Sequence, residues 1–288
     1  MDLLHHIWKL LLGGGLFTAP IPPNPQRVLD FGTGTGIWAI DFADEFPSAT
    51  VIGTDLSPIQ PSWVPPNCMF YIDDSESTWT FKPEEAFDFI HGRAMGGSVK
   101  DWPALYGEIY KHVKPGGWVE IQEYETWCRV NDEEKEKLPE DLLQWQTKIN
   151  EASEKFGKKL LVAGDHKENM IAAGFVDVKD ALYKVVSLFP THSLSIYYRG
   201  LMTKRQVPIG GWPKDPKAKE IGRYERLHML DAVEPFSLAL FSRALGWSKE
   251  EITVIVANVR RDFANPKHHM YSYFHFVTGR RPETPTTS

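Results

Sequence analysis

Apolar and polar positions follow two alternating patterns from residue 27 onward. Short runs of β-branched or aromatic residues, each ending at a polar or glycine residue, predict strands, and apolar residues at every third or fourth position predict helices. This alternation predicts an α/β fold with a parallel sheet, whose functional residues follow the carboxyl ends of the strands. The predicted strands are Arg27–Phe31, Thr50–Thr54, Met69–Ile72, Phe87–His91 and Gly117–Gln122, and the helices between them are Ile37–Phe46 and Asp101–Val113.

The first residues predict an amphipathic helix. The apolar stretch Leu3–Leu16 is interrupted by His5, His6 and Lys9 and meets a run of three glycines at Gly13. It is therefore shorter than the ~20 apolar residues that span a bilayer, and we expect no membrane span.

The second half of the chain has a less regular pattern. A helical stretch runs to about Ala173, a strand-like run covers Val176–Phe189, and a last strand covers Tyr271–Gly279. The residues between these two strands are predicted to be mostly helical, with a Gly/Pro loop at Pro208–Pro216 and a helix at Lys249–Phe263 that begins after a serine cap.

The composition excludes several classes of protein. With 42% hydrophobic residues, 10 Trp, 10 Tyr and 16 Phe, the chain can form a large core, which excludes intrinsic disorder for most of it. The net charge of −6 lacks the basic balance of a nucleic-acid binder, so we expect no nucleic-acid partner. Cys68 and Cys128 cannot build a disulfide framework, and no Cys/His group has zinc-site spacing, so a reducing compartment and no metal are expected.

The most informative string is the glycine-rich stretch Val28–Gly36, which connects a predicted strand to a helix. Glycines there let the backbone approach a ligand closely. A dinucleotide-binding turn needs Gly or Ala where this chain has Ile37, and a phosphate-binding loop needs a Gly-Lys-Ser/Thr ending that is absent. The remaining pattern is Asp-x-Gly-x-Gly-x-Gly, in which the carboxylate of Asp30 suits a ligand with an ammonium group, such as S-adenosylmethionine.

Acidic residues also follow the second and third predicted strands. Asp55 ends the second strand, where a carboxylate can accept hydrogen bonds from both hydroxyls of a ribose. Asp73 and Asp74 follow the third strand, where a carboxylate can accept from an adenine amino group. Any one of these residues could simply cap a helix or a turn. Three acidic strand ends in this order favour a single nucleoside ligand.

A Pro-Gly-Gly turn within Lys114–Glu120 completes a family pattern. With it the chain resembles the class I S-adenosylmethionine-dependent methyltransferases, in which the glycine-rich turn, the acidic end of the second strand and this turn recur in the same order. The resemblance narrows to the LaeA-like fungal methyltransferases and covers nearly the whole chain. The residues that carry it are Leu3-Leu4-His5-His6, Arg27–Trp38, Asp73–Glu76, His91–Arg93 and Leu245–Ser248.

This resemblance implies a Rossmann-like fold with a seven-stranded, mostly parallel sheet. Its last strand, Tyr271–Gly279, would run antiparallel, and helical insertions would form a lid. The resemblance also implies S-adenosylmethionine as cofactor and S-adenosylhomocysteine as product. The residues implied to bind the cofactor are Asp30, Gly32, Gly34 and Gly36 at the methionine end, Asp55 at the ribose, Asp73 and Asp74 at the adenine and Arg93 near the methionine carboxylate, with Thr33 and Leu56 beside them.

The same resemblance suggests how the chain is organised into domains. We expect an N-terminal helix and loop over residues 1–23 and a methyltransferase core over 24–189 and 264–281. A helical lid would cover residues 190–263, and residues 282–288 would form a flexible tail.

Methyl transfer from a sulfonium is an in-line displacement. It depends mainly on holding the acceptor, the carbon and the sulfur in line and away from water. An acceptor that must lose a proton can need a base, although a structural histidine is the more common outcome. The candidate bases, none of them assigned, are His91, Glu123, Tyr124, His192 and His228.

Aromatic residues outside the sheet have two interpretations. Ordinary helix packing is one, and a pocket for a flat or apolar acceptor is the other. We expect the surplus rings to surround the acceptor. They include Trp127, Trp145, Tyr197, Tyr198, Trp212, Tyr224 and Trp247.

The leading hypothesis is a methyltransferase acting on a small molecule, a fungal secondary metabolite, in the cytoplasm. The alternative is a regulatory subunit that acts through a protein partner and can enter the nucleus. An enclosed aromatic cavity would favour the enzyme, and an open groove with an exposed apolar patch would favour the partner. A dehydrogenase is a weaker alternative because of Ile37.

Overall fold

The structure, a computed structural model, describes residues 2–130, 137–182 and 206–283. The chain forms two compact units, and each is assembled from separate stretches of sequence. The first unit contains Met1–Glu123, Val162–Asp180 and His275–Ser288, and the second contains Tyr124–Leu161 and Ala181–Phe274. The stretch Tyr124–Leu161 therefore groups with the inserted residues, whereas the sequence interpretation placed it in the methyltransferase core.

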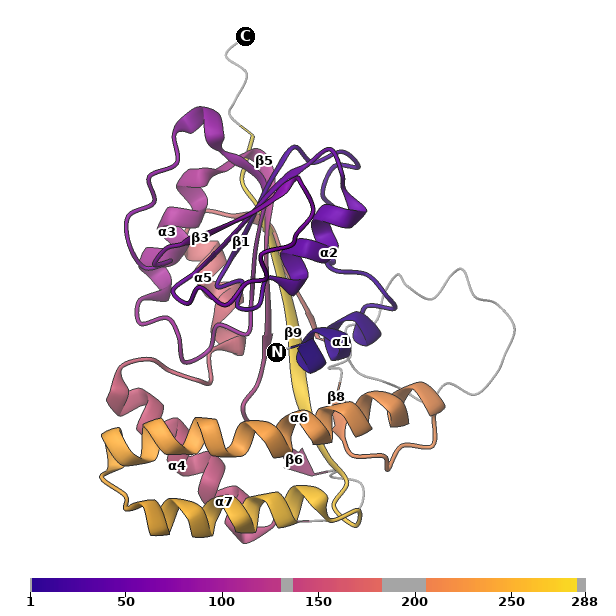
Figure 1. The fold of residues 1–288 in the computed structure, drawn as a ribbon, viewed down its shortest axis with the longest axis vertical. Helices are drawn as coiled ribbons and strands as arrows, with labels where there is room; N and C mark the ends of the chain where they lie inside the picture. The colour runs from indigo at the N-terminus through magenta and orange to yellow at the C-terminus, as the bar shows by residue number, and fades with distance from the viewer. Residues whose placement is uncertain (1, 131–136, 183–205, 284–288) are drawn as a thin grey trace. The chain divides into compact units, whose positions relative to one another are not determined.

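A mixed sheet forms the centre of the first unit (Figure 1). Its first five strands are paired in parallel, and a one-to-one register from Arg27↔Thr50 to Phe31↔Thr54 joins the first two of them in chain order. The strands, in spatial order, are β3 (Cys68–Ile72), β2 (Thr50–Asp55), β1 (Arg27–Phe31), β4 (Phe87–Arg93), β5 (Val113–Tyr124), β9 (Met270–Arg280) and β7 (Val176–Leu182).

The last strand, β9, runs antiparallel to β5. The N–H of Gly116 donates to the carbonyl of Arg281, whereas the N–H of Glu125 donates to the carbonyl of Tyr273, so the two strands run in opposite directions. The expected α/β fold, with a mostly parallel sheet and a reversed last strand, is confirmed.

Helices cover both faces of this sheet (Figure 1). On one face, α2 (Ile37–Glu45) packs Trp38 and Phe42 against sheet residues that include Val28 and Phe89. On the other face, α3 (Trp102–His112) and α5 (His166–Ala172) cover a second cluster that includes Phe31 and Ile90. Short 3₁₀ turns lie at Pro83–Glu85 and Ala163–Asp165.

The N-terminal helix α1 (Asp2–Leu11) belongs to the first unit and ends before the run of three glycines that begins at Gly13. Its apolar face is buried through Ile7, Trp8 and Leu11, and the Trp8 ring meets the edge of Phe276. The predicted amphipathic helix is therefore confirmed, and it is a packed part of the unit.

Helices α4 (Glu140–Phe156), α6 (Pro216–Leu240) and α7 (Lys249–Ala264) build the second unit, with a π-helical turn at Phe241–Leu245. Trp145 lies in their shared apolar core, and Trp247 packs against that core. Helix packing therefore accounts for these two rings. Tyr197 and Tyr198 lie outside the described residues.

Two short strands of the second unit were not expected. β6 (Arg129–Val130) and β8 (Gln206–Ile209) pair antiparallel with the first residues of β9. The expectation of a loop beginning at Pro208 is wrong, because Pro208 lies within β8 opposite Tyr271. Proline is tolerated at the edge of a sheet, and the pairing partner lies too far along the chain for local periodicity to indicate it. In the described ranges, no helix has both the length and the apolar composition needed to cross a membrane.

Candidate functional site

A cavity of about 270 Å³ lies at the carboxyl ends of the parallel strands of the first unit. Its walls come from the turn after β1, the ends of β2, β3 and β4, and helix α1. Eight of the ten predicted cofactor residues line it: Asp30, Gly32, Thr33, Asp55, Leu56, Asp73, Asp74 and Arg93. Gly34 and Gly36 belong to the same turn but do not line the cavity wall.

The turn after β1 needs its glycines partly for packing. Gly32, Gly34 and Gly36 all have positive φ angles, between 59° and 79°, which favour glycine. A Cβ atom on Gly32 would lie 2.1 Å from the sulfur of Met95, and one on Gly36 would lie 2.4 Å from the ring of Phe70. Two of the glycines thus make room for side chains of the protein itself, which the sequence pattern did not indicate.

Asp30 is buried and held from two sides. His91 Nδ1 donates to one carboxylate oxygen at 2.7 Å, and the hydroxyl of Thr33 donates to the other at 2.5 Å. His91 is itself fully buried and stacks on Trp38 with a ring-centre separation of 3.7 Å. Because each carboxylate oxygen has two lone pairs, Asp30 keeps acceptor capacity toward the cavity. His91, a candidate base, does not line the cavity and instead orients Asp30.

Asp55 is fixed by backbone donors on both sides. Its Oδ2 accepts from the N–H of Gly34 at 2.8 Å, and its Oδ1 accepts from the N–H of Ser57 at 2.9 Å. Gln60 also binds the carbonyl of Gly34 at 2.7 Å. The carboxylate is therefore preorganised beside the glycine turn, and each oxygen retains a lone pair for a ligand hydroxyl.

The pair Asp73 and Asp74 lies at the end of β3, on the exposed side of the cavity. Oδ1 of Asp73 accepts from the N–H of Asp74 at 2.9 Å, and Oδ1 of Asp74 accepts from the N–H of Glu76 at 3.0 Å. These local bonds fix the side chains and leave oxygen atoms facing solvent and the cavity.

Arg93 ends β4 and is the cation among the predicted cofactor residues that line the cavity. Burial lowers the pKa of its guanidinium to about 10, and the nearby carboxylates of Asp30 and Asp41 oppose that shift. Its Nη2 donates to Nδ1 of His5 at 3.0 Å, which connects the end of β4 to α1. At physiological pH the group stays charged and can bind a carboxylate.

Helix α1 supplies cavity residues that the sequence reasoning missed. Leu4 and His5 line the cavity beside the predicted residues, and the hydroxyl of Thr35 donates to Asp2 at 3.1 Å. The Leu-Leu-His-His string belonged to the family resemblance, but nothing in the local pattern indicates that this helix folds back onto the end of β4. Met95 and Ser98 are further lining residues without a sequence signal.

The remaining candidate bases lie elsewhere. Glu123 is almost fully buried and accepts from the N–H of Gly96 at 2.8 Å in the first unit. Tyr124 and His228 meet edge to face in the second unit, with ring centres 5.8 Å apart. His192 lies outside the described residues.

A buried carboxylate accompanies His228, and the sequence reasoning missed it. Glu225, one helical turn earlier on α6, is fully buried, and His228 Nδ1 lies 3.6 Å from its Oε1. Among the described residues, neither oxygen of Glu225 has a hydrogen-bond partner. A buried carboxylate that accepts no hydrogen bond is costly, which distinguishes Glu225 from the exposed acids of the same helix.

The lining residues match the polar groups of S-adenosylmethionine in kind. Asp30 can accept from an ammonium group, Asp55 from ribose hydroxyls, and Asp73 or Asp74 from an adenine amino group, while Arg93 can bind a carboxylate. Within the described part of the chain, no three His, Cys, Asp or Glu residues are grouped in a way that could hold a metal ion.

Known proteins are similar to this chain in sequence and in fold. Residues 3–179 match the model of a family described as a methyltransferase domain. Methyltransferase pytC of Aspergillus terreus is 36% identical over 285 residues, which cover 98% of this chain and 80% of pytC. The secondary metabolism regulator LAE1 of Cochliobolus heterostrophus is also 36% identical, over 98% of this chain and 86% of its own length.

A solved structure agrees on the fold. Phosphoethanolamine N-methyltransferase 2 of Haemonchus contortus, in complex with S-adenosyl-L-methionine, superposes with a TM-score of 0.50 at 20% identity, covering 98% of this chain and 52% of that one. The sheet order, the family model and the relatives in sequence all indicate a methyltransferase. The chain belongs to the LaeA-like family of class I, S-adenosylmethionine-dependent methyltransferases.

Proposed function

We propose that the cavity of the first unit binds S-adenosylmethionine and that the protein transfers its methyl group to a small-molecule acceptor, a secondary metabolite, releasing S-adenosylhomocysteine. The observation that carries this proposal is the convergence of four acidic residues and one arginine, from four strand ends, on one cavity. Separate capping roles would not require these side chains to face the same space.

Each part of the cofactor has a proposed partner. Asp55 accepts from the ribose hydroxyls, and Asp73 and Asp74 face the adenine. The turn of Asp30, Gly32, Gly34 and Gly36 holds the methionine end, and Arg93 binds its carboxylate, with Thr33 and Leu56 beside them.

The cofactor supplies the electrophilic methyl group, so the protein's own task is positioning. Asp30, held by His91 and Thr33, fixes the amino group, and Arg93 fixes the carboxylate, which together orient the sulfonium end. Apolar walls from Leu4 and Met95 exclude water from the same space. Of the candidate bases, His91 supports Asp30 in this proposal, and Glu123, Tyr124, His192 and His228 remain candidates for the acceptor.

Calorimetric titration tests the cofactor assignment. We expect S-adenosylmethionine and S-adenosylhomocysteine to bind the wild-type protein and NAD not to bind. Gly34→Asp should weaken binding by about tenfold or more, because it places a carboxylate next to Asp55 at a residue whose φ of 59° disfavours a side chain. Gly164→Asp is the matched control, since a Cβ there meets no atom within 4 Å. Binding of NAD without S-adenosylmethionine would contradict the assignment.

The acceptor is tested with isotope-labelled S-adenosylmethionine and a fungal extract separated into small-molecule and protein fractions. Mass spectrometry should find the labelled methyl group in a small molecule. Label found only in protein would contradict the small-molecule acceptor.

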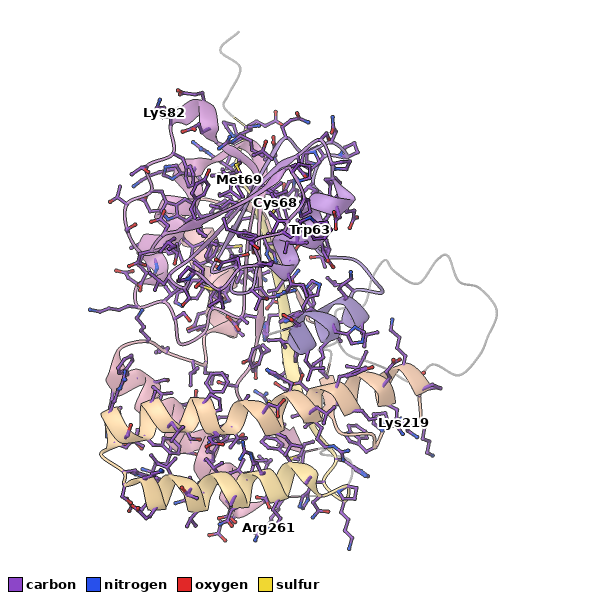
Figure 2. The ribbon with its side chains drawn as sticks, in the orientation of Figure 1. Trp63, Cys68, Met69, Lys82, Lys219 and Arg261 are labelled. Carbon is purple, nitrogen blue, oxygen red and sulfur yellow. The ribbon has the colours of Figure 1, made fainter. Side chains whose placement is uncertain are left out.

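An exposed apolar segment supports a second candidate function, regulation through a protein partner. Within residues 56–72, Leu56 is 64% exposed, Trp63 91% and Ile72 67%, and Met69 and Tyr71 are exposed on edge strand β3. Figure 2 labels Trp63 and Met69, which both belong to the unit that carries the parallel strands. Contiguous exposed apolar patches are typical of interaction surfaces, and these side chains come from one short stretch of sequence.

Affinity purification from a filamentous fungus tests this alternative. A partner that co-purifies with the wild type should be lost with Trp63→Ser, while both proteins bind S-adenosylmethionine equally. A partner that both proteins retain would exclude this surface.

A further inference from the structure

We propose that His5 is a positioning residue: it holds the Arg93 guanidinium in the orientation that binds the methionine carboxylate, and it thereby makes α1 part of the cofactor site. This inference rests on the proposed function of the cavity. His5 is 4% exposed, lines the cavity and comes from a helix distant in sequence from the strand that carries Arg93.

The contacts of His5 determine which of its nitrogens carries the proton. Arginine has five N–H donors and no acceptor, so the Nδ1 atom that receives the bond from Arg93 at 3.0 Å must present a lone pair. Nε2 therefore carries the proton and donates to Oδ2 of Asp41 at 3.1 Å. His5 is thus a neutral imidazole in a defined tautomer between a cation and an anion.

Neighbouring charges keep this arrangement in place. Burial lowers the pKa of His5, and the positive charges of Arg93 and Lys9 lower it further, while Asp41 opposes the shift. The bond from His5 is the main reason that the pKa of Asp41 falls to about 2, and Lys9 also donates to Asp41 at 2.6 Å. Asp41 on α2 therefore holds two side chains of α1 through one carboxylate oxygen, Oδ2.

The segment after α1 is anchored as well. Glu120 on β5 is fully buried, and its Oε2 accepts from the N–H of Ala19 at 2.6 Å and the N–H of Thr18 at 2.7 Å. Its Oε1 accepts from Gln122 at 2.8 Å. The segment between α1 and β1 is thus held near its middle, and α1 is held by Asp41, so contacts within the protein fix the position of His5.

The consequence concerns Arg93. An unrestrained arginine loses side-chain freedom when it binds a carboxylate, and that loss weakens binding. A fixed acceptor on one Nη2 hydrogen orients the planar guanidinium in advance and leaves its other donors for a carboxylate. His5 should therefore affect the affinity only of ligands that carry the methionine carboxylate.

Two substitutions separate the two contacts of His5. In His5→Asn the amide oxygen can take the place of Nδ1 and still accept from Arg93. In His5→Gln the longer amide can reach Asp41 in the place of Nε2 but leaves Arg93 without its acceptor. His6→Gln, at the exposed neighbouring position, is the matched control.

The readout is the dissociation constant of S-adenosylmethionine compared with decarboxylated S-adenosylmethionine, which lacks only the carboxylate. We expect His5→Gln to raise the dissociation constant of S-adenosylmethionine by about tenfold and that of the decarboxylated form by less than about twofold. His5→Asn should restore most of the difference, and His6→Gln should change neither constant.

The outcomes separate this inference from the proposed function. Equal losses for both ligands in His5→Gln, or wild-type affinities in that variant, would overturn the positioning role of His5. A wild-type protein that binds neither ligand would instead overturn the proposed function of the cavity, and one that binds both equally would overturn the role given to Arg93.

Discussion

Gly36 ends the glycine-rich turn where Phe70 of β3 packs against it. The residue has a φ of 79°, and a Cβ atom there would lie 2.4 Å from the Phe70 ring. We expect Gly36→Ala to lower the free energy of unfolding by about 2–4 kcal/mol, because it combines backbone strain with overpacking. Urea unfolding followed by circular dichroism measures the change.

Gly13 provides the control for this substitution. It has a similar φ of 69°, but a Cβ atom there meets nothing within 4 Å. Gly13→Ala should cost only the backbone strain, about 1 kcal/mol. If both variants lose the same stability, the contact with Phe70 is not the reason for glycine at residue 36.

The cavity residues show what a local sequence pattern can predict and what it cannot. Asp30, Asp55, Asp73 and Asp74 could be predicted because each lies at or just after the end of a strand, and parallel strands bring their carboxyl ends together. Their supports could not be predicted, because the partners of Gly36 and Arg93 come from distant elements. The sequence pattern identifies the acidic residues that face the cavity and does not identify the side chains that hold them.

At the scale of elements, α3 and α5 enclose a histidine that must stay neutral. Burial lowers the pKa of His166 to about 3, from an ordinary value of 6.5, and His275 of β9 adds to the shift. Tyr106 of α3 is hydrogen-bonded to its Nδ1 at 3.1 Å, and the Trp102 ring meets it edge to face. Neither Tyr106 nor Trp102 supplies an opposite charge that would stabilise the imidazolium.

The stability of the protein should therefore depend on pH through His166. Its folded pKa lies below the unfolded value, so the unfolded chain takes up a proton first as pH falls below about 6.5. Between pH 7 and 5 this group should lower the free energy of unfolding by about 1–2 kcal/mol. His166→Asn, which does not titrate and can still pair with Tyr106, should remove that part of the slope in urea titrations. An unchanged slope would contradict the neutral, buried state.

Helix α6 contains a carboxylate whose burial should destabilise the protein. Glu225 is fully buried, and neither of its oxygens has a hydrogen-bond partner among the described residues. Glu225→Gln should raise the free energy of unfolding at pH 7 by about 1–2 kcal/mol, because a buried amide without hydrogen bonds costs less than a buried carboxylate without them. Glu234→Gln, on the same helix but half exposed and paired with Arg260 at 3.0 Å, should change it by less than about 0.5 kcal/mol. A large loss in Glu225→Gln would indicate a structural partner for this side chain.

The elements of the second unit show which structures apolar spacing in the sequence can predict and which it cannot. Helix α7 was predicted almost to its ends because its serine cap and apolar spacing are local features, and Ser248 and Glu251 form a reciprocal capping box. β8 was missed because it has four residues, includes Pro208 and forms only by pairing with β9. A short strand is specified by its partner, and the partner is not visible in the strand's own sequence.

At the scale of the whole molecule, chain order and spatial grouping differ. The five parallel strands all lie within residues 27–124, a continuous stretch of the chain, which is why the alternating pattern predicted them. Tyr124–Leu161 joins Ala181–Phe274 instead, because the apolar face of α4 packs with α6 and α7 around Trp145. Composition cannot indicate which of two apolar cores a helix joins.

This grouping predicts where the cofactor acts. All residues that line the cavity belong to the first unit. At short labelling times, when amide exchange reports local opening, S-adenosylhomocysteine should slow hydrogen exchange in α1, in the turn after β1 and in residues 93–98. Exchange in α6 and α7 should stay unchanged, since neither helix contributes a lining residue. Protection in α7 as large as in α1 would mean that the second unit takes part in cofactor binding, and the site would then have to be extended beyond the first unit.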